Sequence, residues 1–92
     1  MQNYTNMNAR EQKRIEREFM IFSKKNFEKP SKCRNLGQLQ YYISELSRMI
    51  DELINEHNYA PQAAYDLLTE YNRAQNSILY VEFKKHYSSA FA

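Results

Sequence analysis

The chain has 92 residues and a formal net charge of +2, with one glycine, two prolines and one cysteine. A chain of this length forms a single domain that buries only about 60 to 65 % of the surface its unfolded form exposes. The scarcity of glycine and proline, with an apolar content of 42 %, indicates a helical protein and argues against a turn-rich β-sheet fold.

The single cysteine, Cys33, can form no disulfide within the chain, whereas a secreted domain of this size would need several. The N-terminal residues are polar and lack the apolar core of a signal peptide, and no stretch approaches the roughly 20 apolar residues of a membrane span. We therefore expect a soluble, cytoplasmic protein with no membrane contact. The abundance of Asn, Lys, Tyr and Ile indicates an AT-rich genome, such as that of a low-GC bacterium or its phage.

The first predicted element is a helix over residues 8–25. It follows residues 1–7, which lack periodicity and are predicted to form a loose tail. Asn8 and Glu11 have the spacing of a capping box, which marks the start of a helix. The apolar residues of this helix are expected to face the core and lie in its second half: Ile15, Phe19, Met20, Ile21 and Phe22.

A connection and a second helix follow. Pro30 marks residues 26–34 as a connection between helices. Asn35 and Gln38 offer another capping box, so that a second helix is predicted over residues 36–57.

A short turn separates the second helix from the third. Asn58 can adopt the left-handed conformation that ends a helix, and Pro61 can open a helix but cannot continue one. The third helix is predicted over residues 61–87, and residues 88–92 are predicted to form a second loose tail. We expect residues 1–92 to form one helical domain.

The apolar residues of the second and third predicted helices mirror each other. In both helices they recur at alternating spacings of three and four residues, which places them on one helix face. Matched antiparallel, the residue numbers of each pair sum to 117: Leu36 with Val81, Leu39 with Ile78, Ile43 with Ala74, Leu46 with Tyr71, Ile50 with Leu67, and Leu53 with Ala64. The match predicts an antiparallel helical hairpin.

The predicted third helix carries a second apolar face, away from the pairing stripe, formed by Leu79, Tyr80, Phe83 and Tyr87. A helix that is apolar on two sides must be covered on both. The first helix has the right size to cover this face within a three-helix bundle. A second copy of the chain, in a homodimer, is the alternative cover.

No residue set has the spacing of a catalytic, cofactor or metal site. Glu82 and His86 are four residues apart, whereas a carboxylate-bridged metal site in a bundle uses Glu-x-x-His pairs. His57 is expected to interact with the last carbonyls of its helix. A single cysteine excludes a thiolate zinc site within one chain, and Cys33 is interpreted as an incidental residue of a polar connection. We therefore expect a non-enzymatic protein with no cofactor, metal or small-molecule substrate.

Charge is distributed unevenly along the chain. Residues 1–34 carry a formal charge of +5, and residues 35–92 carry −3. Folding of the hairpin is expected to gather basic residues at its open end, in a candidate nucleic-acid contact formed by Lys24, Lys25, Lys29, Lys32, Arg34, Lys84 and Lys85. An ordinary solvated surface is the alternative. The turn end is expected to be acidic, with Asp51, Glu52, Glu56 and Asp66.

The chain has eight tyrosines, too many to bury in a domain of this size. Exposed tyrosines favour a protein interface; partial burial with the hydroxyl in water is the alternative. Adjacent Tyr41 and Tyr42 point about 100° apart on a helix, so one of them should face outward or toward the first helix. The candidate protein interface comprises Tyr41, Tyr42, Leu79, Tyr80, Phe83 and Tyr87. The sequence therefore predicts a small helical interaction protein, such as a regulator, inhibitor or assembly factor; the alternative is a nucleic-acid-binding accessory protein.

Overall fold

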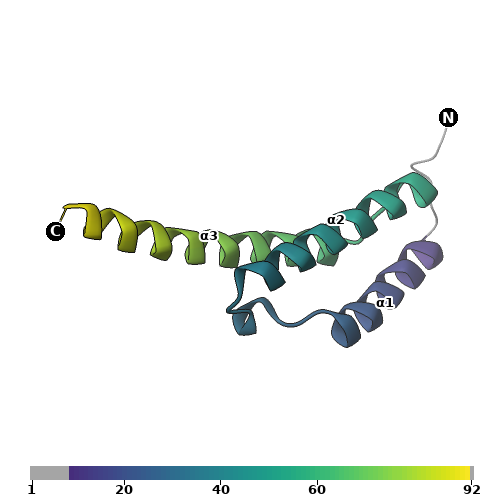
Figure 1. The fold of residues 1–92 in the computed structure, drawn as a ribbon. Helices are drawn as coiled ribbons and strands as arrows, with labels where there is room; N and C mark the ends of the chain where they lie inside the picture. The colour runs from purple at the N-terminus through teal and green to yellow at the C-terminus, as the bar shows by residue number, and fades with distance from the viewer. Residues whose placement is uncertain (1–8, 92) are drawn as a thin grey trace.

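A computed structural model describes the backbone of residues 9–91 and the side chains of residues 9–86. Over these residues the secondary structure consists of three α-helices and one short 3-10 helix, with no β-strand (Figure 1). The helices are α1 (Ala9–Asn26), α2 (Leu36–His57) and α3 (Gln62–Phe91), and the 3-10 helix η2 (Pro30–Lys32) lies between α1 and α2. The predicted all-α fold with an antiparallel α2–α3 hairpin is confirmed.

The helix boundaries agree with the predicted ones to within one residue, except at the end of α3. The backbone of α3 is helical as far as Phe91, four residues beyond the predicted end. The predicted tail over residues 1–7 and the predicted cap at Asn8 lie outside the described residues.

Local capping interactions fix both ends of α2. The backbone N–H of Gln38 donates a hydrogen bond to the Asn35 side-chain oxygen at 3.0 Å, which satisfies one free amide of the first turn. Asn58 adopts the left-handed conformation, with φ of 52° and ψ of 35°, and its N–H donates to the carbonyl of Ile54 at 2.8 Å. Both predicted ends of α2 are confirmed, and the turn to α3 begins at Asn58.

The α2–α3 hairpin holds most of the buried core. Leu39, Leu46 and Tyr71 are fully buried. In five of the six pairs predicted from the sequence, both members belong to this core or pack against it. The exception is the pair of Leu36 with Val81, because Val81 is 52 % exposed. Since α2 begins at Leu36, the part of α3 that follows Val81 has no α2 side chains beside it.

The connection between α1 and α2 is fixed against α3. The hydroxyl of Tyr71 donates a hydrogen bond to the backbone carbonyl of Glu28. Cys33 is only 5 % exposed and belongs to the core, and its Sγ lies 3.5 Å from the carbonyl of Lys29. The interpretation of Cys33 as an incidental residue of a polar connection is therefore wrong: it anchors the connection by burial. Desolvation, and to a smaller extent the nearby Glu28 carboxylate, raises the pKa of the Cys33 thiol, which disfavours the reactive thiolate.

The prediction that the first helix covers the outer face of the third is also wrong. α1 lies toward the turn end of the hairpin, where the hydroxyl of Tyr59 donates a hydrogen bond to the Glu16 carboxylate. Only Ile15 and Phe19 of α1 are buried, while Phe22, which was expected to face the core, is 45 % exposed. The connection crosses α3 beside Tyr71. From there α1 lies along the turn-end part of the hairpin, away from the C-terminal half of α3 (Figure 1).

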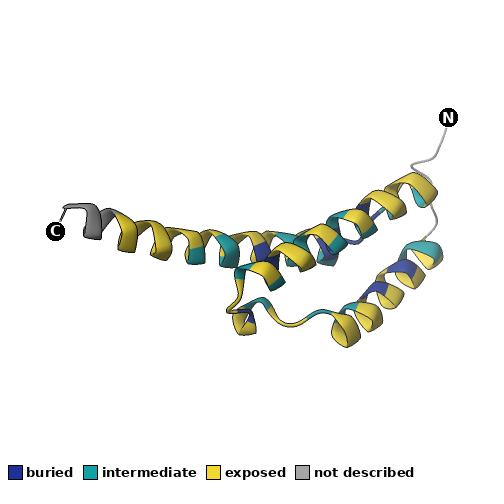
Figure 2. Ribbon diagram, viewed as in Figure 1, coloured by how far each residue is buried: buried dark blue, intermediate teal, exposed yellow. Residues whose placement is uncertain are grey.

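The molecule is therefore elongated, with extents of 63, 29 and 15 Å along its principal axes. The C-terminal part of α3 extends past α1 and α2, and its described residues are coloured as exposed over most of this length (Figure 2). We call residues 79–91 the α3 overhang.

The substitution Leu46→Asp tests the hairpin. Leu46 is fully buried, so an aspartate there removes core packing and places a charge without a partner in the middle of the hairpin. We expect the free energy of unfolding to fall by at least about 4 kcal/mol, enough to unfold a marginally stable domain. Circular dichroism during urea unfolding measures the change. Asp51→Asn, at an exposed position of the same helix, is the control and should change little; an unaltered helical signal in Leu46→Asp would refute the pairing.

Candidate interaction surfaces

The α3 overhang presents an exposed apolar face. Leu79 is 46 % exposed, Tyr80 60 % and Phe83 61 %. The ammonium group of Lys84 lies 5.7 Å from the centroid of the Tyr80 ring, so a cation flanks this face. The side chain of Tyr87, the fourth residue predicted for the face, lies outside the described side chains. Adjacent exposed apolar residues with a charged rim are typical of interaction sites.

The two adjacent tyrosines of α2 have different environments. Tyr42 packs in the core, where its ring stacks on Tyr71 with centroids 5.4 Å apart and meets the edge of Phe27 at 5.4 Å. Tyr41 is 61 % exposed, which confirms that one of the two faces outward. The ring centroids of Tyr41 and Tyr42 are 5.8 Å apart, so Tyr41 extends an internal aromatic cluster to the surface. Tyr42 is held within the core and offers little surface to a partner.

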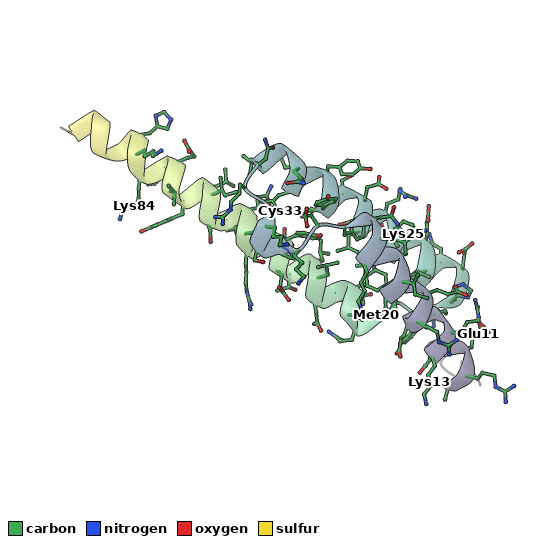
Figure 3. The ribbon with its side chains drawn as sticks, turned by 90° about the horizontal axis from the view of Figure 1, so that it is seen from below. Glu11, Lys13, Met20, Lys25, Cys33 and Lys84 are labelled. Atoms are coloured by element: carbon green, nitrogen blue, oxygen red, sulfur yellow. The ribbon has the colours of Figure 1, made fainter. Side chains whose placement is uncertain are left out.

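The seven candidate basic residues are all exposed, but they do not form one patch. Lys24, Lys29 and Lys32 line a hollow of about 280 Å³ whose walls include Leu67 and Tyr71. Lys84 and Lys85 lie on the overhang, about 20 Å farther along α3 than Tyr71 at 1.5 Å per residue. Figure 3 shows Lys25 and Lys84 on opposite sides of Cys33 along the molecule. Arg34 is exposed and lies in the segment between η2 and α2.

Sequence reasoning did not anticipate a groove between α1 and the turn-end half of α2. Its volume is about 260 Å³. Buried Ile15 and Phe19 form part of an apolar floor, and glutamates from both helices stand at the rim. We call this the α1–α2 groove; its lining residues are Arg14, Ile15, Glu18, Phe19, Phe22, Met49, Glu52, Leu53, Glu56 and His57.

The rim of the α1–α2 groove is acidic. Its lining contains three glutamates and one arginine, a formal charge of −2 with histidine neutral. Arg14 pairs with Glu18 at 3.0 Å, and Arg48, outside the groove, pairs with Glu52 at 2.7 Å. Both ion pairs are exposed and add little stability. Glu56 makes no ion pair within the part of the chain that the structure describes, so its carboxylate is accessible to a cation.

The described residues contain no candidate metal site and no candidate membrane span. No group of three or more His, Cys, Asp and Glu side chains is close enough there to hold a metal ion. None of the helices within residues 9–91 combines the length and apolar character needed to cross a bilayer. Comparisons of the chain with protein-family models, with curated proteins and with solved structures find no match.

The substitution Tyr71→Phe tests how the connection is fixed. It keeps the buried ring but removes the hydrogen bond to the Glu28 carbonyl, and we expect a loss of about 1 kcal/mol in the free energy of unfolding. Tyr42→Phe is the matched control, because Tyr42 lies in the same aromatic cluster and its hydroxyl makes no hydrogen bond to the described residues. Chemical denaturation of both variants measures the difference; equal effects would contradict the role given to the Tyr71 hydroxyl.

The contact between Tyr59 and Glu16 gives a pH prediction. The hydrogen bond to the carboxylate, with smaller effects of desolvation and of the Glu16 charge, raises the pKa of Tyr59 from its ordinary value of 10.0 to about 12. A raised pKa means that the folded state favours the neutral phenol. The contact therefore makes its full contribution to the free energy of unfolding below pH 10, and this contribution is lost as the pH rises through about 12.

The measurement compares the wild type with Tyr59→Phe, which lacks this hydrogen bond. Near pH 8 the variant should be less stable by about 0.5 to 1 kcal/mol, because the contact is partly exposed. As the pH rises through about 12, the wild type loses this contact, so the free energies of unfolding of the two proteins should converge. The other titrating groups are common to both proteins and cancel in the comparison. A constant difference through pH 12 would disprove the link between this contact and the alkaline loss.

Proposed function

We propose that the protein is a small non-enzymatic interaction protein, a regulator, inhibitor or assembly factor of a bacterium or phage, that binds a protein partner or itself through the α3 overhang. The observation that carries this proposal is the exposed apolar face of the overhang. Leu79, Tyr80 and Phe83 are each about half or more exposed, on a helix that extends beyond the rest of the domain.

Helix energetics support this proposal. Most helical stability in proteins comes from the packing of an apolar face, and isolated helices shorter than about 12 to 15 residues are marginal in water. Residues 81–86 are all exposed, so the overhang receives little packing from α1 or α2. A partner that covers Tyr80 and Phe83 would supply the missing packing. Aromatic side chains also give large contact areas for little loss of conformational entropy.

Affinity capture from the native host tests the proposal with three forms of the protein. The overhang variant combines Tyr80→Glu with Phe83→Glu, which places two charges on the apolar face. The control variant combines Gln40→Glu with Ser44→Glu, which adds the same charges at exposed positions of α2. We expect the wild type and the control to retain the same protein and the overhang variant to lose it. Identical retention by all three forms would exclude the overhang as the interface.

A second candidate function is binding of nucleic acid. It is favoured by the hollow that Lys24, Lys29 and Lys32 share with Glu28, because three lysines and one glutamate give its lining a formal charge of +2, which suits a phosphate group. The same captured material, analysed for DNA and RNA at low and raised salt, tests this candidate. Nucleic acid that is released by salt and absent after Lys24→Glu with Lys29→Glu would support it; absence of any salt-sensitive binding would remove it.

A further inference from the structure

We propose that the α3 overhang of one copy of the chain docks in the α1–α2 groove of another copy, so that the protein associates head to tail. This inference rests on the proposed function, because it takes the overhang as an interaction surface and names a second copy as its occupant. Shape, charge and position in the molecule support it.

The groove and the overhang have complementary shapes. The α1–α2 groove has a volume of about 260 Å³ and an apolar floor that includes Ile15 and Phe19. An apolar cavity of roughly 150 Å³ is enough to hold a benzene ring, so the groove has room for one aromatic ring and part of another side chain. The overhang presents two exposed rings, those of Tyr80 and Phe83. A convex aromatic face and a concave apolar groove therefore occur on the same molecule.

The groove and the overhang also carry opposite charges. The groove lining has a formal charge of −2, and residues 79–86 of the overhang carry +1, from Glu82, Lys84 and Lys85. Lys84 lies against the Tyr80 ring, so it would reach the groove rim when that ring enters, and Glu56 has no ion pair within the described part of the chain. Docking two overhangs on each other would instead oppose two positive segments.

The groove and the overhang lie toward opposite ends of the molecule. α3 begins at Gln62, next to the turn that α1 accompanies, and Phe83 lies about 32 Å farther along the same helix. In Figure 3, Lys84 on the overhang and Glu11 on α1 lie toward opposite ends of the molecule. An overhang therefore cannot bend back into the groove of its own chain. Because each copy carries one overhang and one groove, the contact is heterologous and extends into a ring or an open chain of subunits.

The contact area indicates a weak association. An aromatic side chain buries at most about 150 to 250 Å², and the exposed parts of Leu79, Tyr80 and Phe83 supply less than the roughly 800 Å² per partner of a standard stable interface. We therefore expect rapid, reversible assembly that depends on protein concentration, with the monomer dominant when dilute.

Complementation between two variants tests the proposal. The overhang variant, Tyr80→Glu with Phe83→Glu, keeps an intact groove. The groove variant, Glu18→Lys with Glu56→Lys, keeps an intact overhang and changes only exposed positions. Sedimentation velocity of the wild type from micromolar to near-millimolar concentration should show a rising average mass, and each variant alone should associate at least about tenfold more weakly. An equimolar mixture should form dimers, because one functional contact remains between the two variants.

The controls separate this inference from its alternatives. Gln40→Glu with Ser44→Glu should associate like the wild type, and Lys84→Glu is a milder overhang variant should the aromatic substitutions disturb folding, which circular dichroism reports. A wild type that is monomeric at every concentration overturns the proposal. A groove variant that associates like the wild type also overturns it, because the overhangs then pair with each other. If capture still finds an overhang-dependent partner for a monomeric wild type, self-association fails while the proposed function stands.

Discussion

Tyr71 joins the three parts of this fold. Its ring is fully buried between α2 and α3 and stacks on Tyr42, so it belongs to the core of the hairpin. Its hydroxyl bonds the carbonyl of Glu28 and thereby fixes the connection across α3. With the connection fixed there, the contact of Tyr59 with Glu16 and the burial of Ile15 and Phe19 hold α1 beside the turn end of the hairpin. The C-terminal part of α3 is left exposed because α2 begins only at Leu36.

The hairpin could be predicted from the sequence because its determinants are local and periodic. Helix-spaced apolar residues specify the facing stripes of α2 and α3, and Asn35 and Asn58 specify the ends of α2 through hydrogen bonds within four residues. The place of α1 depends instead on contacts between distant residues: Tyr71 with Glu28 in the connection and Tyr59 with Glu16 in α1, each 43 residues apart. The burial of Cys33 likewise depends on packing of the connection against α3, and neither arrangement leaves a periodic signal in the sequence.

The candidate surfaces divide in the same way. The apolar face at Leu79, Tyr80 and Phe83 could be read from spacing, since it needed only the third helix. The α1–α2 groove could not, because it exists only when α1 lies beside the turn-end half of α2. Of its rim glutamates, Glu52 and Glu56 belong to the acidic turn end that the sequence predicts, whereas Glu18 was expected only to lie in solvent. The basic residues do not form the single patch that was expected, for a related reason. The connection crosses α3 beside Tyr71, whereas Lys84 lies 13 residues farther along the same helix.

Few buried side chains attach α1 to the hairpin. Proteins open in cooperative units whose free energies of opening depend on how much apolar surface each unit buries. Because only two of the 18 residues of α1 are buried, we expect α1 to separate from the hairpin at a lower cost than global unfolding, while α2 and α3 remain paired. We therefore expect its amide hydrogens to exchange with solvent sooner than those around Leu46, and the groove that it forms with α2 to be lost whenever α1 separates.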